Sequence, residues 1–366
     1  MTEAQLATLQ WQVLGATGLL SLALGVIFHR THFCTMGAVS DAFIMGHFDR
    51  LRQWALAVTI AALGFAWMTY GGYISPLQSV FAQPGYWLAR IVGGFLFGWG
   101  MVWASGCGAK SIIRAGAGNL KSVFVLLVMG VVALATMKGA LAIPRVYLFE
   151  QPQWTPSTGL FAGQWFSAWF GLDAPTGALA AALFVAFALS VWIFKDSQFI
   201  NVRNVTAGVS VGLIICGVWA VSGILGHGLE HPETLEEFFL STTSGKMEAL
   251  SLTAPVALGL DALMYFSDGT KRITLGMVSV LGIFVGACIS ALLNGSFKLE
   301  VFANADDFIR HAIGASLMGF GAVLALGCSI GQGLSGMSTL NLMSLLATLS
   351  ILVGAVAALK YNLSRL

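Results

Sequence analysis

The feature that most constrains this chain is a series of long apolar runs separated by short, glycine-rich interruptions. Hydrophobic residues make up 57% of the 366 residues and charged residues only 9%, whereas a soluble domain has about 25% charged residues. A helix needs about 20 mostly apolar residues to cross the hydrocarbon core of a bilayer. The chain is therefore predicted to be an all-α integral membrane protein.

Nine apolar runs are long enough to span a bilayer, so we predict nine transmembrane helices. They cover residues 10–28, 53–72, 87–106, 120–142, 175–194, 205–225, 274–294, 310–327 and 341–359. Four other apolar pieces are short or interrupted, at 34–48, 107–118, 248–266 and 328–338. We predict that these four are re-entrant or half-helical, although 248–266 alone is long enough for a tenth span.

Internal symmetry decides how the piece 248–266 is interpreted. A shift of 221 residues places Cys107 on Cys328, together with the glycine pattern before each cysteine. A shift of 220 residues places Asp41 on Asp261, so this piece is the counterpart of the short piece that holds Asp41. The alternative is chance similarity between helices rich in glycine and alanine, and the matched order of all the segments argues against it.

The repeats predict one membrane transport domain, 1–366, with a first repeat at 10–142, a connecting span at 175–194 and a second repeat at 205–359. Four spans and the connecting span precede the second repeat, so the second copy is predicted to be inverted relative to the first. Inverted repeats are the plan of many transporters, whose substrate site lies near the membrane midplane between broken helices.

The distribution of lysine and arginine predicts the orientation, because cytoplasmic loops carry an excess of both. With nine spans, twelve of the 18 basic residues fall on one side and six on the other. The larger set is Arg30, Arg50, Arg52, Lys110, Arg114, Lys121, Lys195, Arg203, Lys298, Arg310, Lys360 and Arg365, and the smaller set is Arg90, Lys138, Arg145, Lys246, Lys271 and Arg272. We therefore predict that the N-terminus lies outside and the C-terminus in the cytoplasm.

The glycine-rich interruptions hold three of the five cysteines. The stretch "WASGCGAKSIIRAGAG" contains Cys107, "LALGCSIGQGLSG" contains Cys328 and "THFCTMG" contains Cys34. Unpaired backbone amides in lipid cost several kcal/mol, so a non-helical chain at membrane depth persists only around a cavity. A half-helix that begins after such a break directs free N–H groups and its positive dipole end into the cavity, which favours an anion.

A thiol is a weak hydrogen-bonding group with a soft, polarisable sulfur. It suits a substrate whose contacting atom is itself sulfur, whereas a hydroxyl would suit phosphate or sulfate better. We therefore predict that Cys34, Cys107 and Cys328 bind the substrate. Cys216 and Cys288 lie in the middle of predicted spans and are interpreted as small core residues.

The three cysteine motifs, in their order and spacing, resemble those of the YeeE/YedE family of sulfur-transport membrane proteins, and the resemblance extends from about residue 15 to 360. It implies a nine-span, hourglass-shaped protein of the bacterial inner membrane that takes up thiosulfate. It also implies that the three cysteines pass the ion along through S–H···S hydrogen bonds. The family further implies a separate small cytoplasmic sulfur-carrier protein of the TusA type as a partner. No cofactor and no bound metal are expected.

Residues around the breaks are predicted to support this site. They are Gly106, Gly108, Lys110, Arg114, Gly327, Gly331, Gly333 and Gly336. The glycines allow sharp turns and a close approach of backbone amides to a ligand. Lys110 and Arg114, four residues apart, either draw an anion toward the cytoplasm or reach the lipid headgroups.

Four other polar residues keep more than one interpretation. His29 and His32 flank Cys34, but no CxxC or HxxxH partner accompanies them, so a lining role is favoured over a metal site. Asp41 and Asp261 are intramembrane carboxylates, which are often functional. They either couple transport to protons, or cap short helices, or pair with Arg30 or Arg50.

Two classes of function remain open. The first is a transporter for thiosulfate or for another sulfur or selenium compound. The second is a membrane sulfurtransferase, in which a cysteine at a helix N-terminus becomes persulfidated. Three thiols spread through an inverted repeat favour transport over a single active centre, and the sequence contains no GxxxxGK[ST] motif for ATP.

Overall fold

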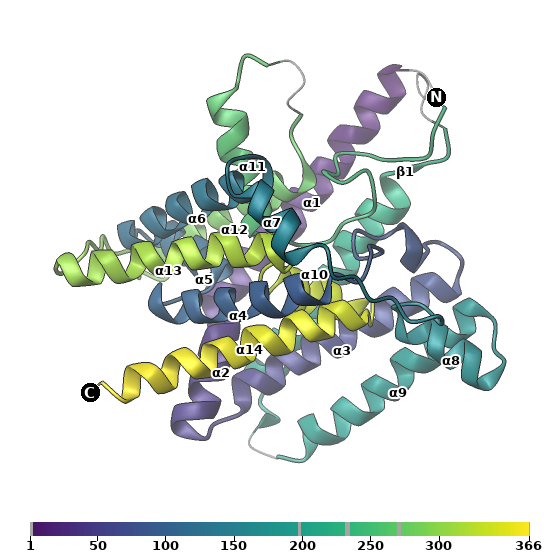
Figure 1. The fold of residues 1–366 in the computed structure, drawn as a ribbon, viewed down its shortest axis with the longest axis horizontal. Coiled ribbons are helices and arrows are strands. Elements are labelled where there is room, and N and C mark those ends of the chain that lie inside the picture. The colour runs from purple at the N-terminus through teal and green to yellow at the C-terminus, as the bar shows by residue number, and fades with distance from the viewer. Residues whose placement is uncertain (1–2, 197–198, 231–234, 269–271, 366) are drawn as a thin grey trace.

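The computed structural model describes residues 3–196, 199–230, 235–268 and 272–365, and nearly all of its regular structure is helical (Figure 1). Within these ranges, nine helices have 17 residues or more. They are α1 (Glu3–Thr31), α3 (Asp49–Tyr70), α4 (Trp87–Trp103), α6 (Leu120–Lys138), α9 (Ala174–Phe194), α10 (Val202–Ala220), α12 (Leu275–Leu293), α13 (Ala305–Leu324) and α14 (Leu342–Leu363).

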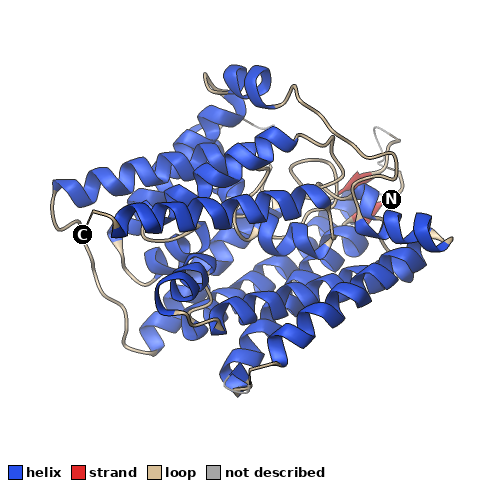
Figure 2. Cartoon of the chain, turned by 60° about the horizontal axis from the view of Figure 1, so that its bottom comes forward, coloured by secondary structure: helices blue, strands red, loops and turns tan. Residues whose placement is uncertain are grey.

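Shorter elements connect these helices. The helical ones are α2 (Thr35–Ser40), η1 (Asp41–Met45), η2 (Pro76–Gln78), α5 (Gly108–Gly116), α7 (Ala142–Phe149), α8 (Ala162–Phe170), η4 (Val221–Leu225), α11 (Thr253–Met264) and η5 (Gly331–Gly336). Two short strands, β1 (His227–Gly228) and β2 (Phe238–Phe239), pair antiparallel near the N-terminus of the chain (Figure 2).

The long helices confirm the prediction of an all-α membrane protein. Eight segments of the described chain are long and apolar enough to cross a membrane, and together they include every long helix except α13. The predicted span 310–327 falls on α13, whose first turns hold Asp306, Asp307 and Arg310. This helix still has 20 residues and packs along α4 and α6, so the charges are confined to one end of it.

The four pieces predicted to be re-entrant or half-helical are short in the structure. The piece 34–48 forms α2 and η1, 107–118 forms α5, and 328–338 contains the six-residue η5. The piece 248–266 forms α11, with 12 residues. At 1.5 Å per residue, none of these helices reaches across a hydrocarbon core about 30 Å thick, so 248–266 is not a tenth span.

Glycines allow the central helices to approach closely. Helix α4 lies between α13 and α14 (Figure 1). A Cβ atom added at Gly93 of α4 would lie 2.7 Å from the carbonyl oxygen of Gly321 in α13, and one added at Gly314 would lie 2.8 Å from that of Gly100. Small residues at such crossings let helix backbones touch inside a membrane.

Loops gather at one end of the bundle and tie its segments together. Met247 N–H donates to Gln78 O at 3.0 Å, and Trp154 N–H donates to Gly85 O at 2.9 Å. We call this the loop-rich end, and its described residues are 71–86, 150–161, 226–230 and 235–252. At the opposite end, Leu120 N–H donates to the carbonyl oxygen of Glu300 at 2.9 Å.

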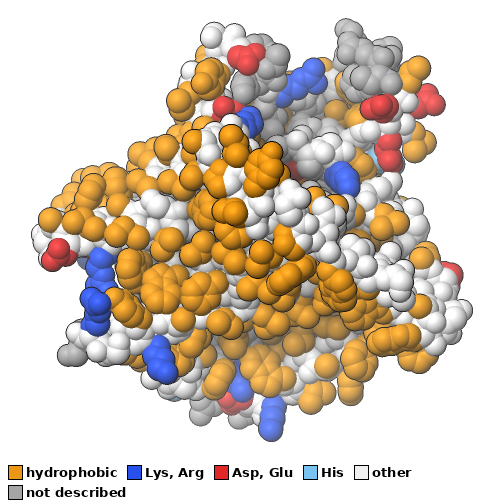
Figure 3. Space-filling view, viewed as in Figure 1, with side chains coloured by type: hydrophobic (Ala, Val, Ile, Leu, Met, Phe, Trp, Pro, Cys, Tyr) orange, Lys and Arg blue, Asp and Glu red, His pale blue; other side chains and the backbone are white. Residues whose placement is uncertain are grey.

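The surface matches a protein that lies in a bilayer. Figure 3 shows a broad band of hydrophobic side chains across one face, with lysines and arginines at its left and lower margins. Large apolar side chains such as Leu19, Phe187 and Leu349 are more than half exposed on their long helices. Contiguous exposed apolar surface of this kind is rare on soluble monomers, and here it is the surface that lipid would cover.

The close packing of α4 predicts the effect of adding a methyl group. A Cβ atom at Gly98 would lie 2.1 Å from the carbonyl oxygen of Ile351 in α14, whereas one at Gly15 of α1 meets nothing within 4 Å. We expect Gly98→Ala to destabilise the protein by about 1–3 kcal/mol or more through overpacking. Thermal unfolding of the purified protein in detergent measures this.

Gly15→Ala is the matched control, because it makes the same change at an exposed position of a long helix. It should leave the melting temperature unchanged or raise it slightly, since alanine favours the helix over glycine. Equal melting temperatures for both variants would contradict the described contact between α4 and α14.

Candidate functional site

The three predicted cysteines each follow a strained turn in the backbone. His32, Ser105 and Leu326 have φ values of 55°, 57° and 58°, and each stands two residues before a cysteine: Cys34, Cys107 and Cys328 respectively. The left-handed conformation costs a residue with a side chain about 1–2 kcal/mol. Three of the six described non-glycine residues with positive φ are these three, and such strain tends to cluster at functional sites.

The breaks before Cys107 and Cys328 are built from the same hydrogen bonds. Gly106 N–H donates to Met101 O at 2.9 Å, and Gly327 N–H donates to Ala322 O at 2.8 Å. One residue earlier in each break, Ser105 N–H and Leu326 N–H donate to the carbonyl oxygens of Val102 and Val323. Each turn therefore keeps its backbone groups satisfied locally, and the cysteine comes directly after it.

Each cysteine stands where a short helical piece begins. Cys34 and Cys107 are the N-cap residues of α2 and α5, and Cys328 lies three residues before the first residue of η5. Gly37 N–H donates to Cys34 Sγ at 3.4 Å, and Gly331 N–H donates to Cys328 Sγ at 3.5 Å. Sulfur thus occupies the position that a serine or aspartate oxygen usually takes at a helix start.

The structure brings the cysteines of the two halves of the chain together. The Cys107 thiol lies next to the Cys34 thiol and next to the side chain of Ser329, the residue after Cys328. Cys107 and Cys328 are 1% and 0% exposed, while Cys34 is partly exposed. The thiols of Cys34 and Cys107 and the chain segment that carries Cys328 therefore meet in one region.

The other two cysteines lie apart from this region. Cys216 in α10 donates its S–H toward the carbonyl oxygens of Ile60 and Ala61, at 3.5 and 3.7 Å. Cys288 lies within α12 and is partly exposed. These positions fit the interpretation of both as residues of helix packing.

The predicted supporting glycines line the short pieces, and neighbouring side chains crowd them. A Cβ atom at Gly331 would lie 3.1 Å from Ser251 Oγ, one at Gly333 2.9 Å from the Trp54 ring and one at Gly336 2.5 Å from Ser344 Oγ. At Gly106, Gly108 and Gly327 the nearest atoms belong to Lys110, Thr253 and Gln332. Gly327 also has φ of 152°, which only glycine adopts readily.

Lys110 and Arg114 of α5 have different partners. Arg114 forms an ion pair of 3.2 Å with Glu300 at the opposite end of the bundle, so its guanidinium is held near the surface. Lys110 is close enough to Cys34 and Cys107 to interact electrostatically with both thiols. Of these two residues, Lys110 is therefore the one that contributes positive charge to the cysteine region.

The two intramembrane carboxylates are paired. Asp41 lies 3.3 Å from Arg50, one of the predicted pairings, and Asp261 lies 3.1 Å from Lys138. Asp261 is the more buried of the two, with 6% of its surface exposed. These ion pairs favour a structural role for both residues, since a buried charge needs a partner.

His29 and His32 lie at the end of the bundle opposite the loop-rich end. His29 Nδ1 lies 2.9 Å from Ser290 Oγ, and His29 and His32 border a shallow cavity with Asn294 and Ser296. Within the described ranges, the structure contains no group of three or more His, Cys, Asp or Glu side chains that could hold a metal ion.

A cavity leads from the loop-rich end toward Cys328. It has a volume of about 230 Å³, and its lining includes Ser244 and Glu248 at the loops and Gly327 and Gly331 at the break. Burial raises the pKa of the Glu248 carboxyl, and hydrogen bonds from Ser244 and Thr243 partly offset this effect. The cavity therefore reaches Gly327 and Gly331, on either side of Cys328 in the chain, and Gly331 N–H donates to Cys328 Sγ.

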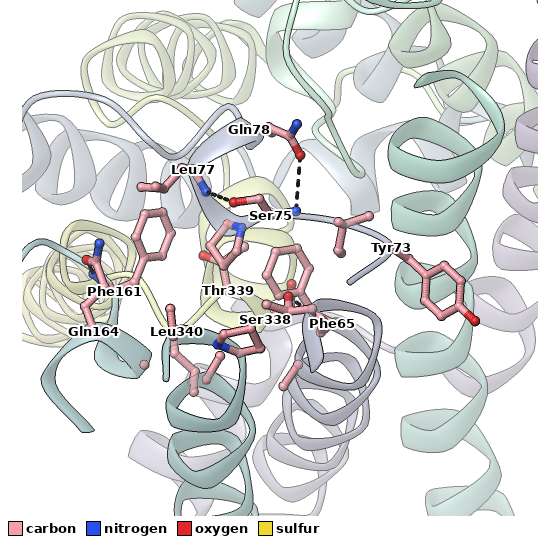
Figure 4. Close-up of a pocket in the computed structure, with 18 of the residues that line it drawn as sticks. Phe65, Tyr73, Ser75, Leu77, Gln78, Phe161, Gln164, Ser338, Thr339 and Leu340 are labelled. Carbon is pink, nitrogen blue, oxygen red and sulfur yellow. Dashed lines mark hydrogen bonds between the residues drawn. The ribbon is translucent and has the colours of Figure 1, made fainter. Parts of the chain in front are cut away.

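A second cavity, of about 410 Å³, lies at the loop-rich end, and its described lining includes no residue of the three cysteine motifs. Figure 4 shows Phe65, Phe161 and Leu340 around it, with Ser75 hydrogen-bonded to Leu77 and Gln78. Its walls are largely apolar, and the titratable side chains in them are Tyr73 and His227. The cysteine region is therefore the better candidate for an anion site.

Sequence reasoning missed several polar side chains near the cysteines. Gln332 donates its side-chain N–H to Ala325 O at 2.7 Å and to Leu326 O at 3.0 Å, which holds the second break in place. Ser329 and Thr35 each follow a site cysteine directly and are buried. The sequence signal that could have indicated them is a serine or threonine directly after the cysteine, in the motifs of Cys34 and Cys328.

The burial of the thiols predicts their order of reaction. We expect methyl methanethiosulfonate to modify Cys34 before Cys107 and Cys328 in the folded protein, because only Cys34 of these three is partly exposed. Mass spectrometry of peptides after brief exposure of the purified protein measures this. In denaturant all five cysteines should react alike, and equally fast modification of the three in the folded state would contradict the described burial.

Comparison with known proteins agrees with the cysteine motifs. A family model described as sulphur transport matches residues 30–357. The thiosulfate transporter TsuA of Spirochaeta thermophila is 28% identical over 345 residues, which cover 92% of this chain and 96% of that protein. The thiosulfate transporter TsuA of Escherichia coli K12 is 28% identical over 320 residues, which cover 85% and 84%. The chain therefore belongs to the sulphur transport family.

Proposed function

We propose that this protein carries thiosulfate into the bacterial cytoplasm along the three cysteines. The observation that supports this most is the meeting of Cys34 and Cys107 with the Cys328–Ser329 segment in one buried region. The names of the two TsuA relatives point to the same ion. Cooperation with a TusA-like carrier in the cytoplasm remains a prediction from the family.

The chemistry of the region fits an anion tipped with sulfur. Thiosulfate has a soft terminal sulfur, which accepts S–H···S hydrogen bonds from thiols. The N–H groups at the starts of the short helices and the ammonium of Lys110 provide positive potential. Each contact is weak, so the ion binds at each thiol and still leaves it, which transport requires.

The route that we propose joins the loop-rich end to the opposite end. The ion enters the cavity of about 230 Å³, whose wall includes Gly327 and Gly331, and from there it reaches Cys328. It then passes Cys107 and Cys34, which contact each other. Beyond them lie Lys110 and His32, which interact electrostatically with one another. This gives a pathway that is wide at its entrance and narrow at the thiols.

Helix contacts support the proposed pair of inverted repeats, 10–142 and 205–359. Helix α1 packs on α12 as α10 packs on α3, and α4 packs on α14 as α13 packs on α6. The repeats match α1 with α10, α3 with α12, α4 with α13 and α6 with α14. When each helix is replaced by its match, the contact of α1 with α12 becomes that of α10 with α3, and the contact of α4 with α14 becomes that of α13 with α6. An internal two-fold symmetry would produce this pattern.

The proposed orientation places the loop-rich end outside the cell. It follows from the excess of lysine and arginine on the side that carries the C-terminus. At that opposite end, Arg52 pairs with Asp196, and Lys121 pairs with Asp307 at 2.7 Å. Of the basic residues used for this prediction, Lys271 lies outside the described residues.

Exchanging sulfur for oxygen tests the proposed function. Cys107→Ser and Cys328→Ser keep nearly the same shape but lose the soft contact, which contributes about 1 kcal/mol for one hydrogen bond. Each 1.36 kcal/mol of added barrier slows passage tenfold, so we expect initial thiosulfate uptake to fall about fivefold or more. Uptake of labelled thiosulfate, at equal expression, in cells without another thiosulfate importer measures this.

Cys216→Ser and Cys288→Ser are the matched controls and should transport like the wild type. Intact uptake in the Cys107 and Cys328 variants, or equal loss in all four, would contradict the cysteine pathway. A persulfide on Cys107 or Cys328 together with cleavage of thiosulfate would instead favour the sulfurtransferase alternative.

A further inference from the structure

The cavity of about 230 Å³ that reaches Gly327 and Gly331, which we call the entrance cavity, has one carboxyl group and no basic side chain among its described lining residues. The carboxyl belongs to Glu248, and the other lining residues are apolar or carry hydroxyl or amide groups. Thiosulfate is a dianion, which a charged carboxylate repels, and salt screens charges in a partly buried space only weakly. The proposed route therefore leads the anion past a group that opposes it, unless that group is protonated.

Hydrogen bonds from its own loop hold the Glu248 side chain in place. Its Oε1 atom accepts from Thr243 N–H at 3.0 Å, from Ser244 N–H at 2.9 Å and from the Ser244 hydroxyl at 2.7 Å. The backbone N–H of Glu248 donates to Ser222 Oγ of η4 at 2.9 Å. Within the described residues no hydrogen bond reaches its Oε2 atom, so this oxygen can take up a proton without breaking a contact.

Among the residues that the structure describes, Glu248 has no ion-pair partner. Lys246 of the same loop donates instead to the carbonyl oxygen of Ala82 at 3.0 Å, and Lys138 of α6 pairs with Asp261 of α11 at 3.1 Å. The chain after η2, the break after α13 and η5 add no titratable side chain to the described lining, and η4 faces Glu248 with a serine. Burial without an ion pair raises the pKa of the Glu248 carboxyl, which favours its neutral form.

We propose that the Glu248 carboxyl binds a proton in the entrance cavity and that the anion passes this point when the carboxyl is protonated. Protonation removes the repulsion and gives Oε2 an O–H group, which a charged oxygen of thiosulfate accepts well. A group that opposes the ion thus becomes one that binds it, and uptake becomes sensitive to the pH outside the cell. This inference rests on the proposed function, whose entrance it describes.

The pH profile of uptake separates this role from a structural one. Above the pKa of a single group, its protonated fraction falls about tenfold for each pH unit. We expect initial uptake by the wild type to rise as the pH falls from about 8 to about 6, by up to about tenfold for each unit. Glu248→Gln keeps an oxygen that accepts the same hydrogen bonds but cannot ionise, so its uptake should vary little with pH and exceed that of the wild type at neutral pH. Labelled thiosulfate and purified protein in liposomes, with the same pH on both sides, measure this without a proton gradient.

Two further variants sharpen the comparison. Glu237→Gln is the matched control, because Glu237 also lies at the loop-rich end but pairs with His227 at 2.7 Å and is not among the described lining residues. It should keep the wild-type pH profile. Ser244→Ala removes a hydrogen bond that favours the charged carboxylate, so it should raise the pKa of Glu248 and move the profile to higher pH. This variant retains the carboxyl and decides the question if Glu248→Gln does not fold.

The outcomes distinguish this inference from the proposed function. Wild-type uptake that does not change with pH, or an unaltered pH profile in Glu248→Gln, would overturn the role of Glu248 and leave thiosulfate transport along the cysteines intact. Loss of uptake at every pH in a Glu248→Gln variant that melts like the wild type would also overturn it, because the charged carboxylate would then be the required form. An unshifted profile in Ser244→Ala would contradict it as well. Wild-type liposomes that take up no thiosulfate at any pH would overturn both.

Discussion

Backbone groups that leave a helix inside a membrane must find other partners, and this constraint organises the structure around the cysteines. The turns before Cys107 and Cys328 meet it with local hydrogen bonds, from Gly106 to Met101 and from Gly327 to Ala322. The N–H groups that remain belong to the starts of the next helical pieces. Cys34 and Cys107 are the cap residues there, so an anion at these breaks would meet sulfur and N–H groups together.

Close helix packing brings the two main breaks together. Helix α4 leads into the first break and α13 into the second, and the two helices cross where Gly93 meets Gly321 and Gly100 meets Gly314. Larger residues there would separate the helices and with them the cysteines that follow. The strained residues before each cysteine are held by this packing, as expected where local strain is part of a functional site.

Periodicity and glycine spacing were sufficient to predict the helical fold and the four short pieces, whereas the binding role of the three cysteines stays a prediction. The span 310–327 was less clear, because charges at the start of α13 lower its apolar character. The sequence did not reveal the contact between Ser329 and Cys107 or the ion pair between Asp261 and Lys138. Each of these contacts joins segments that are more than 100 residues apart, and no local pattern encodes such contacts.

The central claim is that thiols of three breaks hold the sulfur end of the anion. A crystal structure with selenosulfate, in which selenium replaces the terminal sulfur, tests it most directly through anomalous scattering at the selenium edge. The account predicts a selenium peak in contact with Cys107 Sγ and with Cys34 or Cys328 Sγ. A peak in the cavity of about 410 Å³ lined by Phe65 and Phe161, with none at the cysteines, would contradict it.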